Sequence, residues 1–317
     1  MYKFAFTYLV KQDRRTWEDW SISFKLLHKN ILRKLNCSYK ILIFCEGEPN
    51  KKIKSIINYF TKKLKVEIIL QKISLKSYVK RKNSDQYIKN FPHAADCRLN
   101  TSLGYRDMCK FFSLDVFNDI NLNQTEYFIR LDTDSYFLST SNYFIQNLQN
   151  FSLDYGFISN SIQDEDKAVS LGFGKCLYNY CKRNHENSLI NKNYMNLCQE
   201  ATLRPKIFYT NFEIVKLSWA RSTNHQRLLK HIINAKGIYN FRWGDALIRY
   251  YSINLLGASK KALKGCLYKH SGIYDSRNIF TRFMTKLYSL LRGKLYENNY
   301  ERKLSILDKL ILGLLNN

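Results

Sequence analysis

Residues 126–137 read EYFIRLDTDSYF, an apolar run followed at once by two aspartates, Asp132 and Asp134. The run 126–131 is predicted to be a buried strand, and open α/β sheets bind ligands at the carboxyl ends of their strands. Two carboxylates at this spacing can hold one hard divalent cation, Mn²⁺ or Mg²⁺, which often bridges to substrate phosphates. A solvated turn is the alternative for a bare D-x-D, but the strand in front of it favours a metal and diphosphate site.

Three further buried strands are predicted before this one, at residues 3–10, 39–45 and 66–70. They are separated by amphipathic helices, one at 15–35 and a basic one that ends at about Lys65. Alternation of strands and helices is typical of an α/β protein with a parallel sheet and covering helices. The chain has only 3 Pro and no Pro-rich linker, so a single compact domain is expected.

The rest of the chain is predicted to continue this alternation less regularly. The expected elements are a surface connection at 71–104, a helix at 105–118, a strand at 154–159, a loop-rich insertion with short helices at 160–205, a strand at 208–215, and helices at 217–235 and 243–256. Beyond about Asp275, apolar residues recur beside Arg and Lys, which predicts a basic amphipathic helical tail.

The chain is strongly basic, with 51 Lys and Arg against 26 Asp and Glu and a formal net charge of +25. A field of that sign attracts polyanions: nucleic acid, an anionic membrane or a phosphorylated substrate. Abundant Asn, Ile, Lys and Tyr also suit an AT-rich coding sequence, so charge does not choose among these partners. The 8 Cys form no C-x-x-C pair, which argues against a zinc site and leaves free thiols or disulfides open.

Five segments, which occur one after another along the chain, indicate the class of protein. They are YRDMCKFFS at 105–113, RLDTD at 130–134, TNFEI at 210–214, RWGDA at 242–246 and YKH at 268–270. Together they resemble the fungal α-1,2-mannosyltransferase family, retaining enzymes that use GDP-mannose and Mn²⁺. Five ordered motifs are far less expected by chance than any single one.

The resemblance covers about residues 100–275 and, more weakly, the opening strand and first helix. It implies a glycosyltransferase of the GT-A type, with a Rossmann-like mixed sheet flanked by helices. The catalytic domain is expected at residues 1–275, followed by the basic helical tail at 276–317. The implied cofactor is Mn²⁺ or Mg²⁺, and the implied donor is GDP-mannose.

The family pattern also implies roles for individual residues. Asp132, Asp134 and His270 match the metal ligands, and Asp132 also faces the diphosphate. Glu213 matches the acid beside the anomeric carbon, a candidate nucleophile or oxocarbenium stabiliser, because retention needs a negative group there or attack on the face of departure. Asp245 is the second candidate catalytic acid, in the sugar and acceptor pocket.

Five residues are expected to contact substrate: Thr7 in the opening strand, Tyr105 and Arg106 facing the donor, Arg130 near the phosphates, and Trp243 in the sugar and acceptor pocket. Arginine suits phosphate because its forked donors match phosphate oxygens.

Structural alternatives stand beside several of these roles. Glu213 could be a buried, hydrogen-bonded acid of a strand. Asp245 could be an acid at a helix N-terminus, and Trp243 could be a core residue. Arg130 fits a partner for a neighbouring acid, and His270 a surface residue.

The sequence departs from the family where Asp replaces Glu at position 132, where Thr133 replaces Pro, and in SGIYDSR after His270. These departures bear on the sugar, so a UDP-hexose or GDP-fucose donor is an alternative. From other classes, a basic nucleic-acid-binding protein is an alternative, but the sequence contains no recognisable module of that kind. A phosphoryl-transfer enzyme that uses the D-x-D metal site is another, but it gives no reason for RWGDA or NFE.

The expected partners are a nucleotide sugar and a glycan or lipid-linked saccharide acceptor, with no nucleic acid. No secretion signal or run of 18 apolar residues is found in the sequence, so a cytoplasmic protein is expected. Peripheral contact with the inner membrane face through the tail is a further hypothesis.

Overall fold

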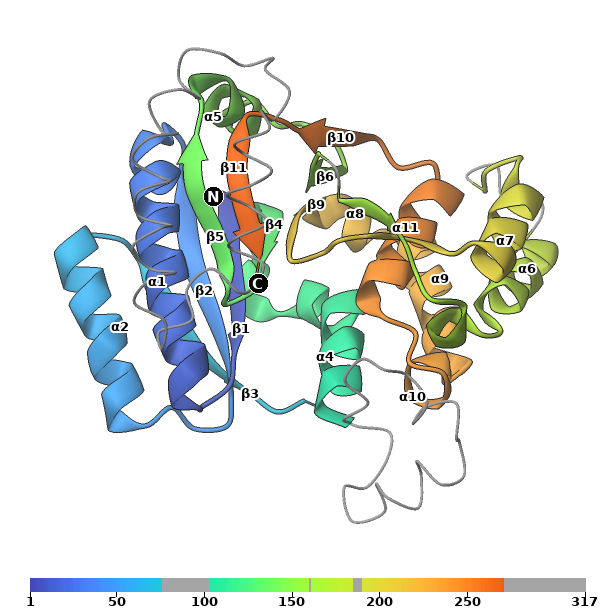
Figure 1. Ribbon diagram of the computed structural model, residues 1–317, viewed down its shortest axis with the longest axis horizontal. Helices are drawn as coiled ribbons and strands as arrows, with labels where there is room; N and C mark the ends of the chain where they lie inside the picture. The colour runs from blue at the N-terminus through green and yellow to red at the C-terminus, as the bar shows by residue number, and fades with distance from the viewer. Residues whose placement is uncertain (76–102, 160, 185–189, 271–317) are drawn as a thin grey trace, which may run out of the picture. The chain divides into compact units, whose positions relative to one another are not determined.

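The computed structural model describes residues 1–75, 103–159, 161–184 and 190–270. By its internal contacts the chain divides into two compact units (Figure 1). Of the described residues, the first unit comprises Met1–Ile73, Ile129–Ser152 and Leu263–His270, and the second comprises those between Ser74 and Phe128 and between Leu153 and Ala262. The predicted tail at 276–317 and most of the connection at 71–104 lie outside the described residues.

The first unit is built on the parallel strands β1 (Tyr2–Val10), β2 (Tyr39–Glu46) and β3 (Ile68–Ile73), with β4 (Thr125–Leu131) beside β1 on the other side. Phe6 pairs with Ile41, and Ile41 pairs with Ile68. Their nearly unbroken apolar runs are what strands covered on both faces require. The four predicted strands are confirmed, although β3 begins two residues later than expected.

Helices α1 (Arg14–Asn30) and α2 (Lys51–Leu64) run side by side against these strands (Figure 1). Asp13 caps α1 by accepting a hydrogen bond from the Thr16 N–H at 2.8 Å, as a helix start requires. Trp20 of α1 lies 5.4 Å from the ring of Phe60 in α2 and 6.2 Å from Tyr8 in β1. The predicted helix at 15–35 is shorter, because Ile31 leaves helical geometry and a 3₁₀ turn, η1 (Leu32–Lys34), follows.

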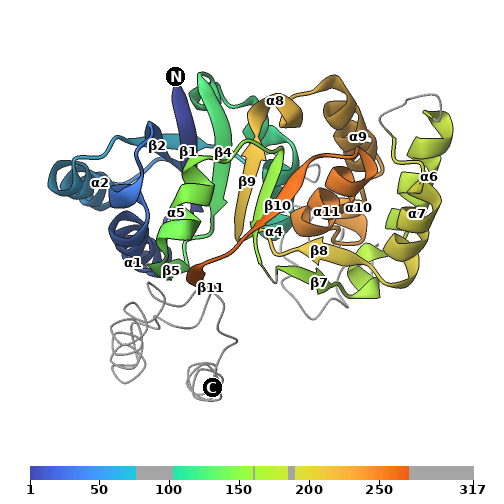
Figure 2. The ribbon, with the colours of Figure 1, turned by 90° about the horizontal axis from the view of Figure 1, so that it is seen from above.

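A two-stranded antiparallel ribbon completes the first unit, together with α5 (Asn142–Gln149). The ribbon pairs β5 (Ser135–Thr140) with β11 (Cys266–His270), and Figure 2 shows the two strands together. In this register His270 faces Ser135, directly after the D-x-D segment. Neither strand was predicted, and this pairing decides where His270 lies.

The second unit holds strands in the order β10 (Lys260–Leu263), β6 (Tyr155–Ile158), β9 (Phe212–Lys216). β6 and β9 are antiparallel, with Phe157 paired to Glu213, so the sheet is mixed as the resemblance implies. A separate antiparallel ribbon joins β7 (Ile162–Asp164) and β8 (Lys206–Phe208).

Helices make up most of the second unit, and the predicted insertion at 160–205 contains two full helices, α6 and α7. The α-helices are α4 (Leu103–Ser113), α6 (Phe173–Arg183), α7 (Tyr194–Leu203), α8 (Leu217–Ala220), α9 (Thr223–Asn234), α10 (Gly237–Asn240) and α11 (Asp245–Leu255). The 3₁₀ turns are η4 (Asp115–Asn118), η5 (Ile120–Leu122) and η6 (Lys167–Ser170). The helix predicted at 217–235 is instead two helices, α8 and α9. Ser222 lies between them and caps the start of α9, because its hydroxyl accepts a hydrogen bond from the His225 N–H.

One hydrophobic core joins the helices of the second unit, and Phe173, Leu228 and Leu247 are fully buried in it. The seven cysteines in the described ranges carry free thiols. Among the helices of the described segments, none combines the length and apolar character needed to cross a bilayer.

Candidate active site

The two aspartates lie in a tight turn between β4 and β5. β4 ends at Leu131, β5 begins at Ser135, and the Ser135 N–H donates to the carbonyl oxygen of Asp132 at 3.1 Å. The turn places both side chains at the carboxyl end of β4, where the sequence predicts the ligand site.

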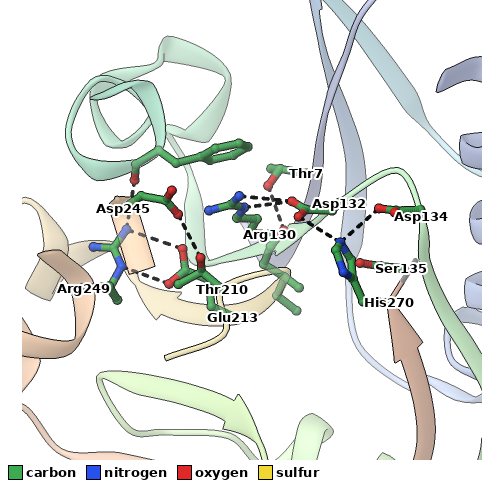
Figure 3. A network of polar contacts seen from close by, with 12 residues as sticks. Thr7, Arg130, Asp132, Asp134, Ser135, Thr210, Glu213, Asp245, Arg249 and His270 are labelled. Carbon is green, nitrogen blue, oxygen red and sulfur yellow. Dashed lines mark hydrogen bonds and ion pairs between the residues drawn. The ribbon is translucent and has the colours of Figure 1, made fainter. Parts of the chain in front are cut away.

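The β5–β11 ribbon brings His270 to these aspartates (Figure 3). Its Nε2 lies 3.1 Å from Asp134 Oδ1 and 3.4 Å from Asp132 Oδ2. We call these three residues the Asp–His cluster. One ligand atom from each lies within 4.8 Å of the others, which is near enough for one ion with bonds of about 2.1 Å to reach all three after small side-chain shifts. Oxygen and imidazole ligands both suit Mn²⁺, so the donor set fits the cofactor that the resemblance implies.

Charges around the cluster are balanced. Arg130 is buried, and its Nε and Nη2 both lie 3.1 Å from Asp132 Oδ1. Burial raises the pKa of Asp132, but the charges and hydrogen bonds of Arg130 and His270 lower it by more, so the carboxylate is ionised. Arg130 therefore pairs with a neighbouring acid, the alternative that the sequence left open.

The pKa of His270 is shifted in the opposite direction to that of Asp132. Burial lowers the pKa of His270, but the hydrogen bonds and charges of Asp132 and Asp134 raise it by more, to about 9. Without a metal, the imidazolium supplies the positive charge that the carboxylates need. A divalent cation has to displace this proton when it binds through Nε2.

The residues around the cluster were mostly missed by sequence reasoning. Ser135 Oγ lies 2.8 Å from the hydroxyl of Tyr268, and the hydroxyl of Tyr136 donates to Asp19 at 3.4 Å. Burial and the charge of Asp134 raise the pKa of Asp19. Thr7, a predicted substrate contact, is fully buried in β1, and its hydroxyl donates to the carbonyl of Ile129 at 2.8 Å.

Glu213 is fully buried on β9 and bound by an arginine that the motifs did not include. Arg249 Nε lies 2.9 Å from Glu213 Oε2, and Nη2 lies 3.5 Å from Oε1. Nη2 also donates to the carbonyl of Phe112 at 2.9 Å, and the guanidinium lies 4.8 Å from the ring of Phe117. The fork fixes the orientation of the carboxylate, and the pair gives Glu213 a structural role whatever its chemistry.

Asp245 is the first residue of α11, after Gly244, and it is buried. Thr210, in the TNFEI segment, donates its hydroxyl to Asp245 Oδ2 at 2.8 Å. Arg249 follows one helical turn later, at the i+4 position, so α11 presents both residues on one face. That spacing is the signal that could have found Arg249.

The other three predicted substrate contacts also lie in the second unit. Arg106 is buried and donates to the carbonyl of Tyr239, so it joins α4 to α10. The guanidinium of Arg242 lies over the ring of Tyr105, with its Cζ atom 4.7 Å from the ring centre. Trp243 is 2% exposed, and its Nε1 donates to the carbonyl of Leu171 at 2.9 Å, as expected of the core alternative.

The position of Trp243 depends on a glycine. A Cβ on Gly237 would overlap the Trp243 indole, so Gly237→Ala is expected to reduce the free energy of unfolding by about 1–3 kcal/mol, the usual cost of overpacking. Gly104→Ala is the matched control, because its Cβ would meet nothing within 4 Å. Urea denaturation of both variants checks this, and equal loss in the two would contradict it.

A mixed sheet with covering helices and a D-x-D turn after one of its strands is the arrangement expected of the GT-A fold. Residues 10–278 match the glycolipid 2-alpha-mannosyltransferase family, and the chain belongs to it. The resemblance drawn from the five motifs is thereby confirmed.

Two curated relatives match the chain over about half of its length. The probable mannosyltransferase KTR4 of Saccharomyces cerevisiae is 29% identical over 164 residues, which are 48% of this chain and 34% of that protein. The probable mannosyltransferase KTR3 of the same organism is 27% identical over 165 residues, 50% of this chain and 40% of that protein. The chain thus matches well under half of the length of either relative.

Solved structures share the fold. Core-mannan synthase A (CmsA/Ktr4) from Aspergillus fumigatus, in its Mn/GDP form, superposes with a TM-score of 0.70 at 18% identity, over 88% of this chain and 77% of that one. Mannosyltransferase Ktr4p from S. cerevisiae, in complex with GDP, gives a TM-score of 0.68 at 20% identity, over 86% and 72%.

Proposed function

We propose that this chain transfers mannose from GDP-mannose to a saccharide hydroxyl, with retention at the anomeric carbon and with Mn²⁺ as cofactor. The observation that carries the proposal is the Asp–His cluster: three residues from two motifs far apart in sequence meet at the end of β4. Family membership supports the metal and the donor, as do the Mn/GDP form and the GDP complex of the two structural neighbours.

In this proposal Asp132, Asp134 and His270 hold the cation. Bound there, Mn²⁺ or Mg²⁺ would neutralise charge that develops on the departing diphosphate. Arg130 holds Asp132 in one orientation through two donors, and its charge keeps that carboxylate ionised. His270 would hold the cation through Nε2 as a neutral imidazole, with its proton released to the solvent.

We assign to Glu213 the stabilisation of positive charge on the sugar, on the strength of its place in the Asn-Phe-Glu motif. An ionised carboxylate in a buried setting is effective at this task, because little solvent screens its charge. Arg249 keeps both carboxylate oxygens in place. Asp245, oriented by Thr210, is proposed to act beside the acceptor.

The donor is tested by thermal unfolding of the chain with GDP-mannose, GDP-fucose, UDP-glucose, UDP-galactose or UDP-GlcNAc, each with Mn²⁺ or with chelator. GDP-mannose with Mn²⁺ is expected to raise the midpoint by about 5 °C at a hundredfold excess over its Kd, and chelator should remove the shift. Transfer to α-methyl mannoside is then followed by NMR of the product, whose new linkage should be α. A larger shift with a UDP-sugar, or a shift that survives chelator, would reject the proposed donor or the proposed metal.

A further inference from the structure

A pocket of about 480 Å³ lies in the second unit and is lined by residues of α6, of α9 and of the Phe241–Trp243 segment. The α6 side of the pocket follows a helical stripe, since its lining residues recur at spacings of three and four. They are Gly172, Lys175, Cys176, Asn179 and Arg183. This side of the pocket is therefore one face of a single helix.

The α9 side is formed by His231, Asn234 and Ala235, again one stripe of a helix. His231 Nε2 donates to the carbonyl oxygen of Cys176 at 3.1 Å and so links α9 to α6 at the pocket. Asn234 and Asn179 are both exposed at the pocket, one from each helix. Two amides on facing helices offer donors and acceptors to a hydroxylated ligand.

Aromatic rings form the remaining wall. Phe241 is half-buried, and its ring stacks on Trp243 at 6.2 Å with an angle of 28°. Trp243 is held in place by three contacts: its hydrogen bond to Leu171, its ring contact with Phe173 at 4.9 Å and its close approach to Gly237. The wall is thus formed before a ligand arrives, which lowers the entropy cost of binding.

The charged side chains among the pocket's lining residues are all basic. Lys175 and Arg183 are exposed lining residues, and α6, α9 and α10 contain no Asp or Glu. The whole stretch 217–244 is also free of acidic residues. A ligand with a negative group is favoured in this field, and a cationic ligand is disfavoured.

We propose that this pocket binds a pyranose that carries an anionic group, a phosphate or a carboxylate, as part of the acceptor glycan. Phe241 packs against the apolar face of the ring, and Asn179 and Asn234 bind its hydroxyls. Lys175 and Arg183 bind the anion. The assignment of this sugar to the acceptor rests on the proposed function, but its binding does not.

Binding is measured by calorimetry on the metal-free chain, with α-methyl mannoside, its 6-phosphate, α-methyl glucuronide and inorganic phosphate as probes. The 6-phosphate or the glucuronide should bind at least about tenfold more tightly than the neutral mannoside, and the comparison of the two separates phosphate from carboxylate. Lys175→Glu and Arg183→Glu should each reduce that affinity about tenfold. Lys230→Glu is the matched control, an exposed lysine of α9 that does not line the pocket, and should leave the affinity within about twofold.

Equal affinity for the charged and neutral sugars, or affinity unchanged in both reversal variants, overturns the proposal. Inorganic phosphate binding as tightly as the sugar phosphate overturns its saccharide part. Thermal midpoints of the variants, expected to match the parent because both side chains are exposed, exclude misfolding as the cause. If the pattern of binding holds but no mannose is transferred, the proposed function fails and the anionic sugar site remains.

Discussion

Asp134→Ala is expected to reduce the rate of mannose transfer about a thousandfold, because it removes one of the three ligands that position the cation against the diphosphate. The apparent Kd for Mn²⁺ should rise with it. Initial rates from GDP-mannose across a Mn²⁺ titration measure both quantities. Asp164→Ala is the control, since Asp164 is exposed and its ion pair with Arg204, at 3.0 Å, is also exposed.

A second readout separates loss of the ligand from loss of the fold. Asp134 is one of the two carboxylates that raise the pKa of His270, so the variant should lower that pKa from about 9 in the metal-free chain. NMR titration of the His270 imidazole measures the shift. Transfer at the parent rate, or a His270 that titrates as before, would contradict the assignment of Asp134.

Arg249→Met is expected to reduce the free energy of unfolding by about 3–5 kcal/mol, because it leaves the carboxylate of Glu213 buried without its cation. Glu213→Gln leaves the opposite charge unpaired and should also destabilise the fold. The double variant removes both charges and should recover at least about half of the loss. Urea denaturation of the four proteins measures this cycle, with Arg204→Met of the exposed pair as a control that changes little.

Activity across the same cycle distinguishes the two roles of Glu213. If Glu213 stabilises the sugar cation, Glu213→Gln lowers kcat about a hundredfold with donor affinity retained, and the double variant stays inactive although its stability returns. Activity that returns together with stability would mean that Glu213 only supports the fold. The buried strand acid, the alternative seen in the sequence, would then be the whole of its role.

The sequence predicted the parts of the fold that local patterns encode. The apolar run before Asp132 marked β4, and the periodicity from Trp17 onward marked α1. The β5–β11 ribbon was missed because each strand is short and SYFLST carries no clear alternation. Its pairing joins residues far apart in the chain, so only the tertiary structure explains how His270 reaches the aspartates.

The sequence also did not show which polar residues are buried or which partners they have. Arg106 was expected to face the donor, yet its guanidinium donates to the backbone of Tyr239, a partner that no local motif indicates. Arg249 stands outside the RWGDA segment although it lies one turn from Asp245 on the same helix. Motif matching located the acids and Arg130, whereas Arg249, which holds Glu213, was found only from the packing of the structure.

The most direct test is anomalous X-ray diffraction from crystals of the chain grown with Mn²⁺ and GDP. The proposed site predicts a manganese peak within about 2.3 Å of His270 Nε2 and of an Asp134 carboxylate oxygen. A fully occupied manganese ion elsewhere, with His270 still hydrogen-bonded to both aspartates, would contradict it.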